Sequence, residues 1–142
     1  MASTWIGSRA RDPPRVILVD SDVLITHLRG HEIAREWLLD VRRRTGPLAV
    51  SVVTIAEITG GMRSGERSDV TRLLGPLLPL AVDARVAWRA GEQRRSYHRS
   101  HQGIGIADHL IAATARVHGC ELATLDVRHV PTVEGRAATF AP

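Results

Sequence analysis

Four acidic side chains stand close to the predicted ends of separate β-strands. Asp20 directly follows the apolar residues 16–19, and Asp126 directly follows residues 121–125. Glu57 lies one to two turns into the helix expected after a second strand, and Asp108 lies in the first turn of the helix that leads into the last strand. In parallel α/β sheets, ligands bind at the carboxyl ends of the strands. We therefore expect these four carboxylates to converge on one site.

A cluster of this kind needs a counter-charge. Like charges about 4 Å apart repel by ~1 kcal/mol in water and by ~4 kcal/mol near a protein surface, so clustered carboxylates need protons or a cation. The chain has no lysine, and Arg128 is the only arginine beside these strand ends. A hard divalent cation with oxygen ligands, Mg²⁺ or Mn²⁺, is the natural counter-charge. Histidine and cysteine do not cluster at zinc spacing, so zinc is not expected.

Each acid taken alone also has a structural interpretation. Asp20 matches a helix N-cap residue, and residues 54–57 match a capping box. Asp108 would complement the dipole at a helix start, and Asp126 could be a turn residue. The functional interpretation depends on the four acids together.

The elements that would position these acids alternate along the chain. Short apolar runs predict strands at residues 16–19, 48–50, 77–82 and 121–125, with a further edge strand possible at 138–141. Helical spacing predicts helices between them, including a long polar helix over residues 83–100 and a helix of small and apolar residues over 106–117. This alternation predicts a three-layer α/β/α fold with a mainly parallel central sheet. Residues 1–15 are expected to form a flexible N-terminal segment, and residues 16–142 a single domain.

Composition excludes several classes of function. The chain has 142 residues, of which 44% are apolar, enough for one core. The absence of lysine excludes a Walker-A loop, Schiff-base chemistry and a kinase-type Lys–Glu pair. No apolar run reaches the roughly 20 residues that cross a bilayer, and one cysteine fits a reducing cytoplasm. The net charge of +4 favours association with a polyanion.

Four motifs appear in order along the chain. They are residues 19–25 (VDSDVLI), Ser51-x-x-Thr54-x-x-Glu57, residues 105–115 (GIADHLIAATA) and residues 123–129 (ATLDVRH). Together they resemble the four motifs of PIN-domain nucleases, in particular the VapC toxins of prokaryotic toxin–antitoxin pairs, over about residues 16–130. Two positions depart from that pattern: Asp22 stands where asparagine or serine is common, and His129 is followed by valine and proline rather than an aromatic residue.

The resemblance implies a PIN-like domain and a Mg²⁺- or Mn²⁺-dependent endoribonuclease. It implies a cytoplasmic homodimer that a VapB-like antitoxin inhibits, with no membrane partner, and a toxin that acts on translation or growth. By this match Asp20, Glu57, Asp108 and Asp126 are the acidic residues of the site, with Asp20, Asp108 and Asp126 as metal ligands.

Other polar residues are assigned accessory roles. The hydroxyls of Ser21, Thr54 and Thr124 could orient carboxylates or water, although local backbone caps are an equally good interpretation. Asp22 adds a fifth acid near the site.

RNA must reach an acidic site, so basic residues should line its approach. Candidates on or just after the long polar helix are Arg85, Arg89, Arg94, Arg95 and Arg99, with His98 and His101. A solvated helix face and an antitoxin-docking surface are the alternatives. Trp37 and Trp88 are expected in the core or a dimer interface, because a chain with 4% aromatic residues is poorly supplied for base stacking.

Two other classes of protein compete with the nuclease interpretation. An aspartyl-phosphate phosphatase would explain Asp20 and Asp22, but the chain has Leu24 where such sites need threonine, and it lacks the catalytic lysine. A non-catalytic metal- or RNA-binding protein of the same fold remains open, because the acids alone do not prove turnover.

Overall fold

The computed structural model describes residues 15–97, 103–126 and 139–141. Within them, four short strands form one sheet in the order β3-β2-β1-β4, and every neighbouring pair is parallel. The strands are β1 (Ile17–Val19), β2 (Ala49–Ser51), β3 (Leu78–Leu80) and β4 (Glu121–Ala123). β1 lies in the middle of the sheet, so Asp20 follows a strand that has neighbours on both sides.

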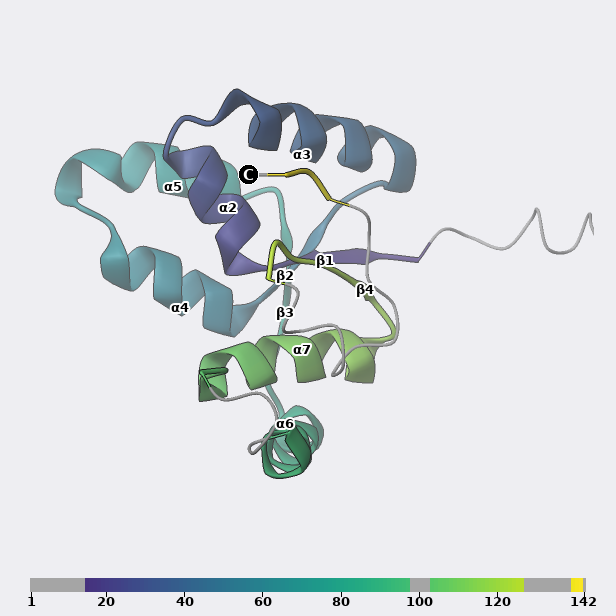
Figure 1. The fold of residues 1–142 in the computed structure, drawn as a ribbon. Coiled ribbons are helices and arrows are strands. Elements are labelled where there is room, and N and C mark those ends of the chain that lie inside the picture. Colours follow the sequence, from purple (N-terminus) through teal and green to yellow (C-terminus); the bar gives the residue numbers. More distant parts are fainter. Residues whose placement is uncertain (1–14, 98–102, 127–138, 142) are drawn as a thin grey trace, which may run out of the picture.

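Helices cover both faces of this sheet (Figure 1). The helices in chain order are α2 (Ser21–Leu28), α3 (Glu32–Thr45), α4 (Val52–Gly61), the short 3₁₀ helix η1 (Ser64–Glu66), α5 (Arg67–Leu74), α6 (Ala84–Tyr97) and α7 (Ile106–His118). Figure 1 shows α2, α3 and α5 on one side of the strands and α7 on the other, with α6 beyond α7. The predicted α/β/α fold with a parallel sheet is confirmed.

The strand residues alternate between two cores, as the period of two in a β-strand requires. Ile17 and Val19 pack with Val23, Val41 and Ile58 on the side of α2, α3 and α4. A second set on the other side joins the strands to α7: Leu18, Ala49, Ile111, Ala112, Ala115, Cys120 and Leu122. Because both faces of β1 are buried, its sequence is a continuous apolar run rather than an alternating one.

The packing of α7 explains why this helix consists mainly of small residues. Ala113 of α7 packs against Val86 and Ala90 of α6, while Ala112 and Ala115 face the sheet. Alanine on both faces lets α7 lie close to both neighbours. Gly119 then ends α7 in the left-handed conformation, with φ +68°, and leads the chain into β4.

The structure differs from the sequence-based expectations at the chain's edges. Residues 139–141 form no strand, although Phe140 packs against Trp37 with ring centroids 6.1 Å apart. The long polar helix is described only as far as Tyr97. The expected flexible segment, residues 1–15, lies outside the described residues except for Arg15. No helix among the described residues is long and apolar enough to span a membrane.

Candidate active site

Asp20 occupies the turn between β1 and α2, where it is 4% exposed. Its backbone N–H still belongs to the sheet, because it donates to the Ala123 carbonyl of β4 at 2.9 Å. Its Oδ1 accepts from the backbone N–H of Ser21 at 2.7 Å, as an N-cap residue of α2. The capping role expected as the alternative for Asp20 is therefore present, and it leaves Oδ2 for a second contact.

Two hydroxyls link the turn between β1 and α2 to the segments after the neighbouring strands. Thr124, just after β4, donates to Asp20 Oδ2 at 2.7 Å and lies 3.1 Å from Asp22 Oδ2. Ser21, just after β1, donates to Glu57 Oε1 of α4 at 2.8 Å. We call Asp20, Ser21, Asp22, Glu57 and Thr124 the acidic cluster.

Thr54 supports this arrangement from inside α4. It is fully buried, and its Oγ1 lies 3.1 Å from Ser21 Oγ. Since the single Ser21 proton goes to Glu57, the Thr54 hydroxyl donates to Ser21. The capping-box interpretation of residues 54–57 is wrong, because α4 begins earlier and its N-cap is Ser51, which accepts from the Val53 N–H.

Asp22 is the member of the acidic cluster whose negative charge is most costly. Burial, followed by repulsion from the Asp20 carboxylate, raises the pKa of Asp22 from 3.8 to about 6, although hydrogen bonds from Leu125, Thr124 and Val23 oppose the rise. The Leu125 N–H donates to Asp22 Oδ2 at 3.0 Å, whereas Oδ1 is buried without a hydrogen-bond partner among the described residues. Such an oxygen favours a proton or a cation beside it.

Asp126 lies just after β4, and Asp108 lies in the first turn of α7. The Asp126 N–H donates to Thr124 Oγ1 at 3.0 Å, which links this residue to the acidic cluster. Asp108 Oδ2 accepts from the Gly105 N–H at 3.1 Å, so Asp108 stabilises the start of α7 as its structural interpretation required.

The donor set consists entirely of oxygen, which suits a hard cation such as Mg²⁺. The buried, unpartnered Oδ1 of Asp22 fits the same chemistry. In the part of the chain that the structure describes, however, no three His, Cys, Asp or Glu side chains are grouped closely enough to hold a metal ion. The assignment of Asp20, Asp108 and Asp126 as ligands therefore stays a prediction.

The predicted RNA-binding arginines lie on α6. Arg85, Arg89, Arg94 and Arg95 are exposed there, whereas Arg99, His98 and His101 lie outside the described residues, as do Arg128 and His129. Trp88 is 75% exposed, so it is not a core residue, and its alternative place in a dimer interface stays a prediction. Trp37 is partly buried and packs against the first core, as expected.

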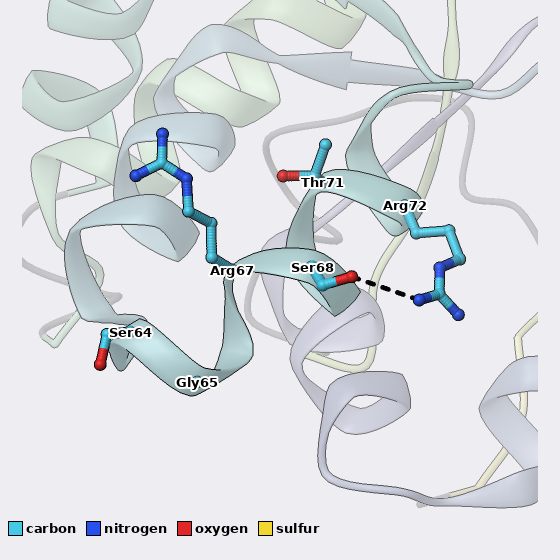
Figure 2. Close-up of a pocket in the computed structure, with 6 residues that line it drawn as sticks. All are labelled: Ser64, Gly65, Arg67, Ser68, Thr71 and Arg72. Carbon is cyan, nitrogen blue, oxygen red and sulfur yellow. Dashed lines mark hydrogen bonds between the residues drawn. The ribbon is translucent and has the colours of Figure 1, made fainter.

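A hollow of about 640 Å³ lies at η1 and α5, and no residue of the acidic cluster lines it (Figure 2). Its lining carries hydroxyls and the guanidinium groups of Arg67 and Arg72, but no carboxylate. Figure 2 shows these two arginines extending to opposite sides, with Arg72 donating to the Ser68 hydroxyl at 3.3 Å. This hollow therefore lacks the groups that would hold a metal or activate water.

The sequence matches the PIN domain family over residues 17–132, which is most of the chain, so the chain belongs to that family. It is 52% identical over 126 residues to Ribonuclease VapC10 of Mycobacterium tuberculosis, a match that covers 89% of this chain and 94% of the relative. It is 32% identical to Ribonuclease VapC19 of the same organism, over 80% of this chain and 91% of the relative. The fold is similar to a toxin–antitoxin complex from Klebsiella pneumoniae, with a TM-score of 0.71, 23% identity, and coverage of 89% of this chain and 99% of the other. The resemblance seen in the motifs is confirmed, and the phosphatase alternative is removed.

Proposed function

We propose that this chain is a metal-dependent endoribonuclease that hydrolyses RNA phosphodiester bonds and is the toxin of a VapBC-type pair, acting on translation or growth. The observation that carries the proposal is the acidic cluster. Two hydroxyls hold it together: Thr124 after β4 donates to Asp20 at the end of β1, and Ser21 donates to Glu57 of α4, the helix that follows β2. The relatives named as VapC ribonucleases support the same activity.

Asp20, Asp108 and Asp126 are the residues that we propose as ligands of Mg²⁺ or Mn²⁺. When bound, such a metal polarises a phosphoryl oxygen and lowers the pKa of water towards 7. Glu57 is exposed, and the Ser21 hydroxyl holds its Oε1 at 2.8 Å. The other carboxylate oxygen of Glu57 can then accept a proton from the attacking water.

Thr124 and Thr54 act as positioning residues in this proposal. Thr124 holds the Asp20 and Asp22 carboxylates together and also accepts the Asp126 N–H, so it fixes two carboxylates and the backbone of Asp126. Thr54 fixes the Ser21 hydroxyl. Since both threonines are buried, their geometry does not depend on solvent.

An antitoxin partner is the second part of the proposal. A cleft of about 580 Å³ lies between α2, α3 and α5, and leucines as well as Arg35, Arg42 and Arg72 are among its lining residues. Leu39 lines it and is 52% exposed. A lining that combines leucines with arginines suits an amphipathic segment of a VapB-like protein. We further propose that the chain forms a homodimer, which light scattering tests. We also propose that it acts in the cytoplasm, which cell fractionation tests.

Incubation of the pure protein with total RNA, with Mg²⁺ or with EDTA, tests the activity. We expect fragments with Mg²⁺ alone and none from Asp20→Asn at unchanged folding, because this substitution removes a proposed ligand. Leu39→Arg should cleave normally but escape inhibition by the antitoxin. If wild-type protein shifts the mobility of RNA without cutting it under any metal, the chain is a binding protein rather than an enzyme.

A further inference from the structure

A basic cleft of about 650 Å³ runs along α6 and the end of α7. Arg85, Arg89, Glu92 and Arg116 line it, together with Trp88, which is 75% exposed. We propose that this cleft binds a single-stranded segment of RNA, with one base stacked on Trp88 and the neighbouring phosphates bound by the arginines. The inference depends on the proposed ribonuclease function and adds a contact remote from the acidic cluster.

The packing of α6 explains why Trp88 faces outwards. Val86 and Ala90 are fully buried against Ala113 of α7, so they fix which side of α6 meets the rest of the chain. Trp88 lies halfway between them in sequence and is turned about 200° from each, on the opposite side. The largest side chain of the helix is therefore held in solvent by a fixed helix, and its flat ring can stack on a base at little cost in conformational entropy.

The charges around Trp88 favour a polyanion. Three arginines and one glutamate line the cleft. Arg85 and Arg89 form no ion pair within the described residues. Arg85 is also fixed in place, because its Nη2 donates to the Val117 carbonyl at 3.2 Å and ties α6 to the end of α7. Guanidinium groups beside an aromatic ring combine phosphate binding with base stacking, as in sites for single-stranded nucleic acid.

A second copy of the chain fits this cleft less well. In a two-fold dimer the same patch meets itself, so an interface centred on Trp88 would bring two sets of three arginines together. A single Glu92 in each copy would not balance them, and like charges in contact oppose association. RNA supplies the negative charge that balances the arginines and a base that can stack on Trp88.

Helix α7 connects the cleft to Asp108, which is one of the proposed metal ligands. Asp108 lies in the first turn of α7, and Arg116 lies eight residues further along it. This separation is about 12 Å of helix rise, which is within the length of a short RNA segment. An RNA held at Trp88 would therefore raise the local concentration of substrate near Asp108 rather than take part in bond cleavage.

Binding of a fluorescein-labelled single-stranded oligoribonucleotide of mixed sequence, measured by anisotropy in EDTA, tests the proposal. Trp88→Ala should weaken binding about tenfold or more, the loss of one stacked base, while Trp88→Phe should stay within about threefold of wild type. Arg89→Ala should weaken binding and reduce the slope of log K against log salt by about 0.7. The matched control is Arg67→Ala, which removes the same charge from the hollow on α5 and should have less than a threefold effect.

Three outcomes would overturn the inference. The first is that Trp88→Ala binds RNA as the wild type does. The second is that Arg67→Ala weakens binding as much as Arg89→Ala does. The third is that Trp88→Ala changes only the molar mass in light scattering, which would assign the cleft to a second copy of the chain.

Cleavage of total RNA with Mg²⁺ separates these failures from failure of the proposed function. A wild type that cuts RNA while Trp88→Ala binds normally refutes this cleft alone, whereas a wild type that neither cuts nor binds RNA refutes the proposed function. Circular dichroism should show unchanged melting for Trp88→Ala, since the side chain is exposed.

Discussion

Replacing Asp22 with asparagine should stabilise the metal-free chain at neutral pH. Burial and the nearby Asp20 carboxylate raise the pKa of Asp22 from 3.8 to about 6, which corresponds to about 3 kcal/mol of preference for the protonated form. Because Asp22 is only partly buried, solvent screening reduces this figure, and we expect a gain of about 1–2 kcal/mol in the free energy of unfolding.

Asparagine preserves the hydrogen bonds that Asp22 makes. Its Oδ1 can take the place of Asp22 Oδ2, where it accepts from the Leu125 N–H and lies beside the Thr124 hydroxyl, and its amide then takes the place of the unpartnered Oδ1. The Thr124 proton stays on the shorter of its two contacts, 2.7 Å to Asp20 against 3.1 Å to residue 22. The substitution therefore mimics a protonated Asp22 and removes only the charge.

The gain should depend on pH in one direction. The unfolded chain ionises Asp22 near pH 3.8, whereas the folded chain ionises it near pH 6. Above pH 6 the wild type carries the full cost of a buried charge, and below pH 3.8 neither state is charged, so the cost vanishes. The advantage of Asp22→Asn should therefore grow as the pH rises from about 4 to about 6 and then stay constant.

Urea unfolding in EDTA at pH 4 and pH 8 measures this difference. The matched control is Asp69→Asn, which removes an exposed carboxylate paired with Arg72 at 4.0 Å and should change stability by less than about 0.5 kcal/mol. An Asp22→Asn variant no more stable than wild type at pH 8, or equally stabilised at both pH values, would refute the account of Asp22. Added Mg²⁺ should narrow the gap, because a cation relieves the same repulsion.

Three further predictions concern single residues. Thr124→Val should lower the free energy of unfolding by about 2 kcal/mol and Thr124→Ser by much less, measured in urea, because valine leaves the Asp20 carboxylate and the Asp126 N–H without their partner. Gly119→Ala should destabilise by about 1 kcal/mol because φ is +68°, whereas Gly91→Ala, inside α6 with open space around it, should stabilise by about as much. Burial raises the pKa of the Cys120 thiol, so a colourimetric thiol reagent should react slowly until denaturant is added, and fast reaction in buffer would contradict this.

The central strands and the parallel fold were predictable because buried strands leave a direct mark on the sequence. β1 is buried on both faces, so its residues form an uninterrupted apolar run, and Asp20 ends that run at the strand's carboxyl end. The same reasoning placed Asp126 beyond the last strand, but it put Thr124 inside a strand over residues 121–125, whereas β4 ends at Ala123. The order of the strands, β3-β2-β1-β4, was not predicted, because the sequence pattern does not say which strands pair. Parallel βαβ units predict only that the carboxyl ends of the strands meet at one edge of the sheet.

The hydrogen-bond partners of the site could not be predicted in the same way. Residues 54–57 match a capping box, yet Thr54 lies within α4 because β2 ends at Ser51, which takes the capping position. Thr54 instead meets Ser21, which is 33 residues away in the chain. A local pattern contains no information about such a contact. In the same way, the spacing on α6 identified its apolar side but not the exposure of Trp88.

The acidic cluster has fewer hydrogen-bond donors than its carboxylates require. This shortage of donors connects the cost of the cluster in folding stability with its proposed role in binding a metal ion. Ser21 and Thr124 each offer one hydroxyl proton to the three carboxylates of the cluster, and among the described residues neither Asp22 nor Glu57 forms an ion pair. One oxygen of Asp22 remains buried without a donor. A site selected for stability alone would have asparagine at this position, as the Asp22→Asn prediction states. Natural chains tolerate such a cost where function requires it, and a cluster that lacks protons gains the most from a bound cation.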